Sequence, residues 1–261
     1  MIRLRHIVPR YFEKVLRCHV LVLPLLILSS SAYAQTPDLD QVLGRIITAY
    51  GGEENLRKLD AHVQEWDVVA LMGNRHGTDM RTIHLPDRLK VKLRYPDTTE
   101  TRIVDGEHSL VLYRGQPARS AGHPQRDAMR LQLMRLYSPL VLREKLDFLD
   151  LTVDGEFCVI TLFEHGVRAD YVVNTNNWHI EKVVGTVAIK GREMQFLTEY
   201  SSFAFQDGVL VHERENKFAG GVNTAVLRLR RIVFDADLND SDFLPDEEPG
   251  EQPGKDQDDI I

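Results

Sequence analysis

The sequence contains little cysteine and none of the short motifs that mark common catalytic sites. Two of its 261 residues are cysteines, Cys18 and Cys158. The nucleophile elbow G-x-S-x-G, the P-loop, the dinucleotide-binding turn G-x-G-x-x-G and the zinc motif H-E-x-x-H are all absent from the sequence. We therefore predict that the protein is not an enzyme and that it has no catalytic residue and no cofactor.

Histidines and paired carboxylates do not indicate a site either. Eight histidines follow residue 34, and no two of them stand three to five positions apart, the spacing of local metal motifs. We expect them at the surface or in turns, and we predict no metal site. Asp154 and Glu156, like Glu213 and Glu215, stand two apart within strand patterns, where side chains share one face. We expect these carboxylates to be solvated.

The first 34 residues have the pattern of a secretory signal peptide. Basic residues precede an apolar run at 20–28, and Ala32-Tyr33-Ala34 supplies an A-x-A cleavage site. The apolar run has nine residues, whereas roughly 20 cross a bilayer, so an uncleaved anchor is the weaker alternative. We predict export and cleavage after Ala34. Cys158 is then the only cysteine of the mature chain, which has no internal disulfide.

Acidic charge is concentrated at the C-terminus. Residues 235–261 contain eleven acidic residues, one lysine and three prolines, whereas acidic and basic residues are nearly balanced between 35 and 234. A balanced body offers no electrostatic footprint for nucleic acid. We predict a single folded domain at 35–240 and an acidic disordered tail at 241–261.

Period-two alternation dominates the predicted domain. Helical spacing occupies 39–50 and 53–59 near its start. About a dozen strand patterns follow, at 62–72, 78–85, 88–95, 98–104, 107–114, 148–153, 156–163, 167–173, 178–189, 192–205, 209–218 and 224–234. Short turns between successive strands indicate an antiparallel meander, and a meander this long must curl into a barrel or split into two sheets.

One long helical pattern interrupts the strands at 126–146. Its apolar residues form two stripes on opposite sides, one of Met129, Leu133, Leu136, Tyr137 and Leu140 and the other of Leu131, Met134 and Leu142. A helix with two apolar sides needs two packing partners. Ser138 can cap a new helix and Pro139 suits its first turn, so we predict two short helices hinged at these residues.

The strand pattern at 88–95 alternates most cleanly. Its apolar residues are Leu89, Val91, Leu93 and Tyr95, and its basic residues are Arg88, Lys90, Lys92 and Arg94. We expect the basic face to be solvated, with binding of an anionic lipid or partner as the alternative. In a curved sheet the apolar face lines a concavity that side chains, a lid helix or a ligand must fill.

Short motifs mark helix ends and turns along the domain. They are Ala49-Tyr50-Gly51-Gly52, Leu85-Pro86-Asp87-Arg88-Leu89, Tyr95-Pro96, Val104-Asp105-Gly106, Val153-Asp154-Gly155 and Phe205-Gln206-Asp207-Gly208-Val209. In content and order they resemble those of the periplasmic lipoprotein carriers of the Lol type and of the related outer-membrane lipoprotein-sorting proteins. The resemblance covers about 200 residues, and a helical insertion within the meander belongs to it.

The resemblance implies a mainly β fold with some α: a strongly curved antiparallel sheet, an open or half β-barrel of about eleven strands, whose concave face is covered by helices. It implies a periplasmic protein that binds and shuttles a lipid or lipoprotein acyl moiety, with a membrane-bound donor or acceptor protein as a further partner. The alternative is an envelope sensor or adaptor that uses the same half-barrel to bind a protein.

Combined with the alternation above, the resemblance assigns three groups of residues. The predicted lipid-cavity lining comprises Leu89, Val91, Leu93, Tyr95, Met129, Leu133, Leu136, Tyr137 and Leu140. The predicted lid hinge is Ser138 and Pro139. Arg130 and Arg135, which interrupt the apolar surface of the helical pattern, are predicted to latch the lid.

Overall fold

The computed structural model describes residues 38–246 of the chain. These residues all lie in one compact unit. The predicted signal peptide at 1–34 and residues 247–261 of the predicted tail lie outside the described residues. Between residues 38 and 246, no helix is long and apolar enough to cross a membrane.

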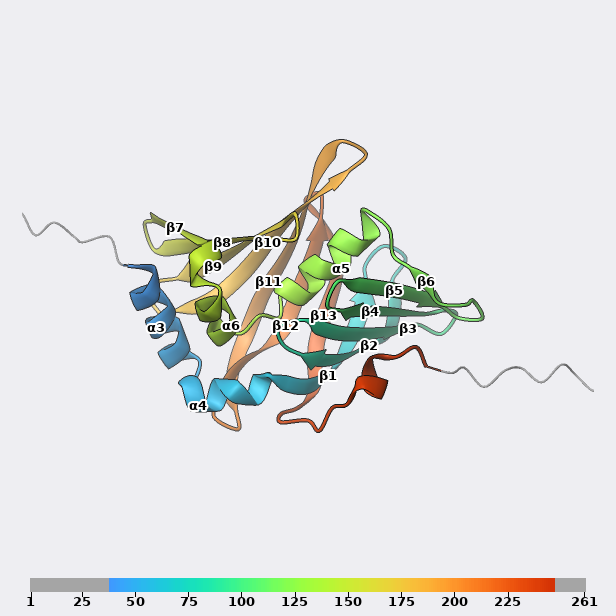
Figure 1. Ribbon diagram of the computed structural model, residues 1–261, viewed down its shortest axis with the longest axis horizontal. Coiled ribbons are helices and arrows are strands. Elements are labelled where there is room, and N and C mark those ends of the chain that lie inside the picture. The colour runs from blue at the N-terminus through green and yellow to red at the C-terminus, as the bar shows by residue number, and fades with distance from the viewer. Residues whose placement is uncertain (1–37, 247–261) are drawn as a thin grey trace, which may run out of the picture. The chain divides into compact units, whose positions relative to one another are not determined.

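The strands of the described residues form one antiparallel sheet of 13 strands (Figure 1). The first six are β1 (Ala61–Ala70), β2 (Arg75–His84), β3 (Arg88–Arg94), β4 (Thr99–Asp105), β5 (His108–Tyr113) and β6 (Arg119–Ser120). The other seven are β7 (Leu149–Asp154), β8 (Phe157–Glu164), β9 (Val167–Asn174), β10 (His179–Ile189), β11 (Arg192–Gln206), β12 (Val209–Ala219) and β13 (Val222–Val233).

The order of the strands explains why the sheet stays open. It runs β6-β5-β4-β3-β2-β1-β13-β12-β11-β10-β9-β8-β7, so the first and last strands of the chain pair in the middle. The two edges are β6 and β7, which are neighbours in sequence but lie at opposite ends of the sheet. The chain must therefore cross from one edge to the other, and the helical insertion makes this crossing (Figure 1).

The predicted architecture, a mainly β fold with a curved and unclosed antiparallel sheet, is confirmed. The predicted count of about eleven strands is too low. Strand β6 has only two residues, both exposed, and it pairs with β5 alone. A two-residue strand within a polar loop carries no alternation, so the sequence pattern does not reveal it.

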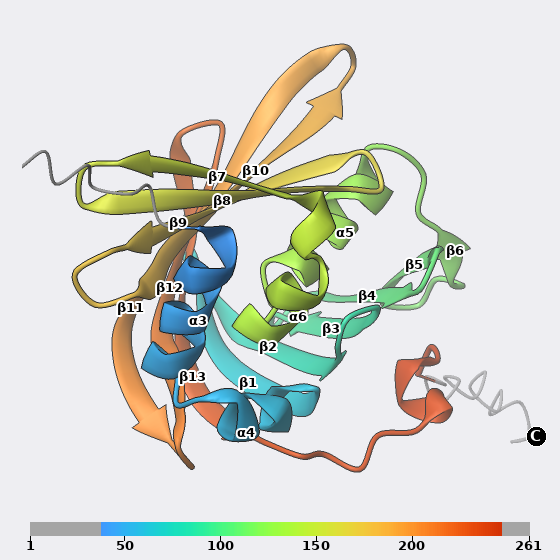
Figure 2. The ribbon, with the colours of Figure 1, turned by 60° about the vertical axis from the view of Figure 1, so that its left-hand side comes forward.

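The helices lie at one end of the sheet and within its curve (Figure 2). Helix α3 (Leu39–Ala49) and helix α4 (Glu53–Leu56) are followed by the 3-10 turn η1 (Arg57–Leu59). Helix α5 (Gln125–Met134) and helix α6 (Pro139–Glu144) form the insertion, and the 3-10 turn η2 (Leu146–Phe148) follows them. We call residues 125–144 the bridging segment.

The predicted break in the bridging segment is present. Ser138 has extended backbone angles, and its hydroxyl accepts a hydrogen bond from the amide of Val141, 3.4 Å away. Pro139 is the first residue of α6, where its missing N–H leaves no helical hydrogen bond unmade. Two short helices at an angle therefore replace one long helix.

Both apolar stripes of the bridging segment are buried against protein. Helix α5 packs on β4 from one side of the curved sheet and on β9 and β10 from the other. Helix α6 packs on α3 and α4. The buried residues are Met129, Leu131, Leu133, Met134, Tyr137, Leu140, Val141 and Leu142. The packing partners of the two stripes are therefore the two halves of the sheet for α5 and the helices α3 and α4 for α6.

Two pairs of sequence motifs meet in the fold. The turn Asp207-Gly208 lies against the end of α3, where the amide of Leu210 donates to the carbonyl of Tyr50 at 3.1 Å. A Cβ atom on Gly51 would lie 2.0 Å from the carbonyl oxygen of Gly208, so only glycine allows this approach. Similarly, the amide of Gly106 donates to the carbonyl of Asp87. These motifs are positions of close backbone packing.

The C-terminal end of the described chain packs on the outer face of the sheet. The 3-10 turn η3 (Asp240–Phe243) contacts β3 and β4, and Phe243 is buried there. The carboxylate of Asp246 pairs with Lys90 and Lys92. Residues 241–246, the start of the predicted tail, are thus folded. The basic face of β3, which we expected to be solvated, is largely neutralised by the chain itself.

Candidate functional site

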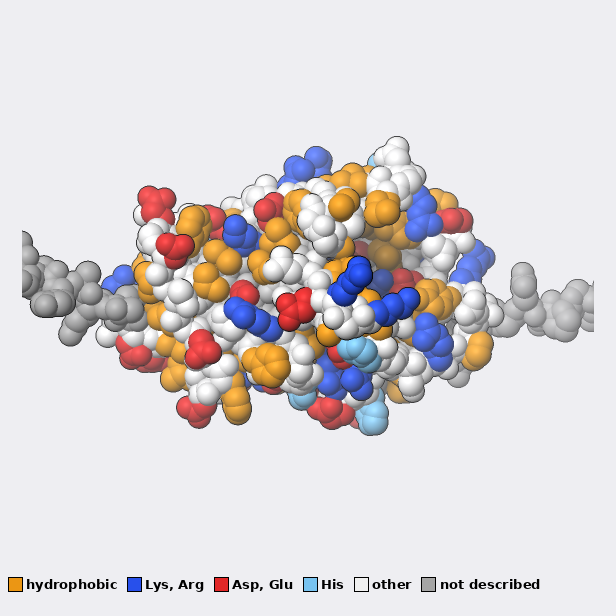
Figure 3. All heavy atoms as spheres, turned by 90° about the horizontal axis from the view of Figure 1, so that it is seen from above, with side chains coloured by type: hydrophobic (Ala, Val, Ile, Leu, Met, Phe, Trp, Pro, Cys, Tyr) orange, Lys and Arg blue, Asp and Glu red, His pale blue; other side chains and the backbone are white. Residues whose placement is uncertain are grey.

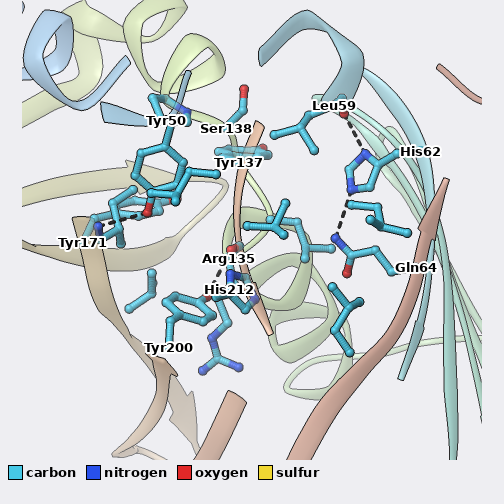
Figure 4. Close-up of a pocket in the computed structure, with 18 of the residues that line it drawn as sticks. Tyr50, Leu59, His62, Gln64, Arg135, Tyr137, Ser138, Tyr171, Tyr200 and His212 are labelled. Carbon is cyan, nitrogen blue, oxygen red and sulfur yellow. Dashed lines mark hydrogen bonds between the residues drawn. The ribbon is translucent and has the colours of Figure 1, made fainter. Parts of the chain in front are cut away.

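An apolar cavity of about 80 Å³ lies beneath the linker between α5 and α6 (Figure 4). It is bounded by the linker, by the end of α3 and by the strands that face them. The lining residues are Tyr50, Leu59, His62, Gln64, Trp66, Arg135, Leu136, Tyr137, Ser138, Pro139, Tyr171, Ile180, Val183, Tyr200, Leu210, Val211, His212, Leu229 and Ile232. Ligand pockets usually measure about 300–1,000 Å³. In this structure the bridging segment therefore fills most of the space within the curve of the sheet.

One wall of the cavity is a directional chain of hydrogen bonds along β1 (Figure 4). The atom that contacts His62 Nδ1 is the carbonyl oxygen of Leu59, which can only accept, so His62 donates to it at 2.7 Å. The other ring nitrogen of His62 then accepts from the amide of Gln64 at 3.1 Å, and Gln64 accepts from the indole of Trp66 at 3.0 Å. Every polar group in the wall finds a partner without an ionised imidazole.

Burial keeps His62 neutral. Removal from water is the main reason that its pKa falls from 6.5 to about 4. We expected the histidines at the surface or in turns, and for His62 this is wrong, because the side chain points inward from β1 and is 2% exposed. Its inward position follows the alternation of β1, in which His62, Gln64 and Trp66 share the buried face.

Two tyrosines satisfy the carbonyls at the end of α5. The Tyr171 hydroxyl donates to the carbonyl of Met134 at 2.7 Å, and the Tyr200 hydroxyl donates to that of Arg135 at 3.2 Å. The last carbonyls of a helix have no partner within it, so such donors are needed where a helix ends in the interior. Burial raises the pKa of both phenols, which keeps them protonated as donors.

Charged contacts hold the rest of the bridging segment. Arg130 pairs with Glu107 in the turn after β4, at 2.6 Å. Arg135 donates to the carbonyl of Phe196 in β11, at 2.8 Å. The predicted latch arginines therefore contact opposite halves of the sheet.

Close packing also fixes the position of α5. A Cβ atom on Gly185 of β10 would lie 2.2 Å from both methyl carbons of Leu131. The missing side chain at Gly185 is what allows α5 to approach β10, and Leu131 fills the space completely, with 1% of its surface exposed. Gly185 is therefore part of the surface on which the bridging segment packs.

Beside the apolar cavity lies a buried group of charges. Arg81 forms a two-pronged ion pair with Glu215, at 2.7 and 2.9 Å, and contacts Asp79 at 3.0 Å. Burial alone would raise the pKa of Glu215, but the charges of Arg81 and Lys217 hold it well below its usual range. Glu215, expected to be solvated, is 2% exposed. Strand β12 places it on the inner face, opposite the expected one.

The structure places the predicted lining and hinge residues, and the latch residue Arg135, in three surroundings. Leu136, Tyr137, Ser138 and Pro139 line the 80 Å³ cavity, as does Arg135. The main core contains Leu89, Val91, Met129, Leu133 and Leu140. Leu93 and Tyr95 pack instead on a small cluster of Trp66, Val68 and Leu227. Their role in lining a lipid cavity, and the motion at the hinge, stay predictions.

The sequence interpretation missed the polar residues of the site. They are Tyr50, His62, Gln64, Arg81, Tyr171, Tyr200 and Glu215. For those in strands, the sequence does show which residues share a face with them, because side chains alternate between the two faces of a strand. Which face is inner becomes clear only from the pairing of β1 with β13.

Comparison with known proteins places this geometry in a structural group. No protein-family model matches the sequence, and no curated protein matches it. A domain described as an outer membrane lipoprotein-sorting protein, from Vibrio parahaemolyticus, superimposes with a TM-score of 0.50 at 8% identity, over 77% of this chain and 94% of that one. A LolA superfamily protein from Nitrosomonas europaea gives 0.53 at 14% identity, over 74% and 95%. The chain has the LolA-type fold.

A further structure extends the group. A protein of the DUF1329 family from Desulfovibrio piger has a TM-score of 0.50 at 12% identity, over 80% of this chain and 98% of that one. At such identities the likeness concerns the LolA-type fold alone. It agrees with the resemblance seen in the motifs.

Proposed function

We propose that the protein is a periplasmic carrier that binds and shuttles a lipid or a lipoprotein acyl moiety. The observation that supports it most is the bridging segment itself. It covers an apolar cavity, and the side chains of Arg130 and Arg135 join it to the two halves of an open sheet. A carrier needs a binding site and a way to open it. It needs no catalytic group, and the proposal assigns none.

In this account the bridging segment is a lid that moves about Ser138 and Pro139. The closed cavity of about 80 Å³ has space for two or three water molecules at about 30 Å³ each, so an acyl chain enters only when the lid lifts. Burial of about fourteen methylene groups, at about 0.8 kcal/mol each, contributes on the order of 10 kcal/mol. That gain offsets the cost of lifting the lid, which consists of a few hydrogen bonds worth about 1 kcal/mol each and the exposure of the lid's own apolar side chains.

A fluorescent fatty acid titrated into the mature protein tests this function. We expect saturable binding that Leu136→Glu abolishes, because a carboxylate in the cavity wall repels the chain and costs several kcal/mol to bury. Leu146→Glu is the matched control, since Leu146 follows α6 and is 36% exposed. Absence of binding by the unaltered protein would refute the carrier function.

A second candidate is a sensor or adaptor that binds a protein. The edge strand β7 favours it, because among residues 38–246 it pairs only with β8 and leaves one row of backbone groups to pair with a partner strand. Phe148 and Phe163 lie exposed beside it. Pull-down of one stoichiometric protein with an empty cavity, lost on Val153→Pro in β7, would favour this function over the carrier.

A further inference from the structure

A second cavity, of about 150 Å³, adjoins the apolar one. It lies between α5 and the strands β2, β4, β11 and β12, and its lining residues are Arg81, Arg102, Ala128, Leu131, Gln132, Arg135, Leu136, Phe196, Thr198, Tyr200, Glu215 and Lys217. The two cavities share Arg135, Leu136 and Tyr200. The two cavities are therefore adjacent, with these three side chains in the wall of both.

The second cavity has a cationic lining. Four basic side chains, Arg81, Arg102, Arg135 and Lys217, face a single lining carboxylate, Glu215. The Lys217 side chain is 24% exposed. On the face of the molecule in Figure 3, Lys and Arg side chains gather around a hollow in the surface.

Flanking carboxylates neutralise most but not all of this charge. Arg81 is paired with Glu215 and Asp79, and Arg102 with Glu100 through two bonds of 2.9 Å. The Lys217 amine lies 3.4 Å from Glu215. Among the described residues the Arg135 side chain has no carboxylate partner within 4 Å, and its one hydrogen bond goes to the Phe196 carbonyl.

Two donors in the lining have no partner among the described residues. They are the Nε of Arg135 and the hydroxyl of Thr198, a residue that is 1% exposed. Asp79 Oδ1 is an unpaired acceptor nearby, but Asp79 is not part of the lining. Buried donors without partners cost about 1–3 kcal/mol each, so an acceptor that reaches both would bind favourably. The surplus positive charge favours an anionic acceptor.

We propose that this cavity binds the anionic head group, a carboxylate or a phosphate monoester, of the amphiphile whose acyl chain enters the adjoining apolar hollow. The inference rests on the proposed carrier function and names its ligand class. Guanidinium and hydroxyl donors suit both anions, and charge-assisted hydrogen bonds are about twice as strong as neutral ones. The volume of about 150 Å³ accommodates either group.

Calorimetric titration with four ligands tests the proposal. Myristic acid and 1-myristoyl lysophosphatidic acid carry the anion, monomyristoylglycerol has the same chain without charge, and inorganic phosphate has no chain. We expect both anionic lipids to bind at least about tenfold more tightly than the neutral one. Arg135→Gln, which retains an amide donor for the Phe196 carbonyl, should bring this ratio close to one.

The ratio of affinities separates the head-group site from the lid, because loosening of the lid by Arg135→Gln affects all three lipids alike. Thr198→Val provides a second variant that removes a donor without removing charge, and it should lower the ratio in the same direction. Arg168→Gln removes one positive charge from an exposed position on β9 and should leave the ratio unchanged. Circular dichroism of each variant confirms that it is folded.

Each outcome bears on a different claim. Equal binding of anionic and neutral lipids overturns the head-group site and leaves the carrier function intact. Binding of inorganic phosphate alone, sensitive to Arg135→Gln, supports an anion site and overturns the carrier function. Failure of all four ligands to bind overturns both.

Discussion

The Nη2 atom of Arg135 donates a 2.8 Å hydrogen bond to the carbonyl oxygen of Phe196, and this bond fastens the end of helix α5 to strand β11. The carbonyl of the same arginine accepts from Tyr200, which is also in β11. One residue thus joins the bridging segment to one half of the sheet through both its side chain and its backbone. Any movement of this end of α5 away from β11 breaks both bonds.

Removal of the Tyr200 hydroxyl should loosen the bridging segment. Tyr200→Phe leaves the Arg135 carbonyl without its side-chain donor, at a cost of about 1–2 kcal/mol. Amide hydrogen exchange in residues 125–144 should then be about 5- to 30-fold faster. Mass spectrometry of exchanged peptides measures this, with β12 and β13 as the internal reference.

The matched variant for that experiment is Tyr171→Phe. The Met134 carbonyl that Tyr171 contacts also accepts from the amide of Tyr137 at 3.1 Å, so it keeps a partner. A smaller acceleration is therefore expected. An equal effect of both variants would show that packing of the rings, rather than the hydrogen bond of Tyr200, holds the segment.

A methyl group at Gly185 should disturb the packing of α5 on β10 and lower the free energy of unfolding. Gly185→Ala places a carbon where the Leu131 side chain lies, and overpacking of this kind costs about 1–3 kcal/mol. Leu131→Ala alone should cost about 2–5 kcal/mol through the cavity that it creates. The double variant should be at least about 1 kcal/mol more stable than the sum predicts, because each change relieves the other. Urea unfolding supplies all the free energies, and strict additivity would contradict the contact.

Stability should fall when the pH is lowered from 7 to 5, and His62 should account for much of the fall. Its folded pKa of about 4 lies below the ordinary 6.5, so in this range the unfolded chain binds a proton that the folded chain does not. The free energy of unfolding should drop by about 2 kcal/mol from this residue. His62→Gln, which can still donate to Leu59 and accept from Gln64, should reduce the drop. An unchanged pH dependence in this variant would contradict the assignment.

The C-terminal contact on β3 and β4 should depend on its aromatic residue more than on its charges. Phe243 is 3% exposed, so Phe243→Ala should lower the free energy of unfolding by about 3 kcal/mol. Asp246→Asn should lower it by less than about 1 kcal/mol, since its pairs with Lys90 and Lys92 are partly exposed and screened. Urea titrations at low and high salt test both values. A larger effect of Asp246→Asn would contradict this ranking.

Much of the fold follows from local patterns in the sequence. Turns and alternation locate twelve of the strands to within about three residues, and Ser138-Pro139 marks the break between α5 and α6. Such features depend on neighbours in the chain, whose spacing is visible in the sequence. The two apolar stripes of the bridging segment likewise indicate that it is covered on both sides.

The buried polar residues could not be predicted in the same way. Arg81 and Glu215 are 134 positions apart, and each reads locally as an ordinary charged residue on a strand. Their burial depends on the pairing of β1 with β13, which joins the two halves of the sheet and decides which face is inner. The second cavity and its cationic lining follow from that same pairing. Alternation along a strand shows which residues share a face, but only the pairing of the strands shows which face is buried.

Native mass spectrometry of the protein isolated from the periplasm, the compartment that we predict for it, tests the central claim most directly. We predict a population of the mature chain with one bound acyl-bearing molecule, and collisional activation should release that molecule as an anion. The amount bound should fall in Leu136→Glu and remain unchanged in Leu146→Glu. A mature chain free of lipid that is recovered with a stoichiometric protein partner would contradict the carrier account.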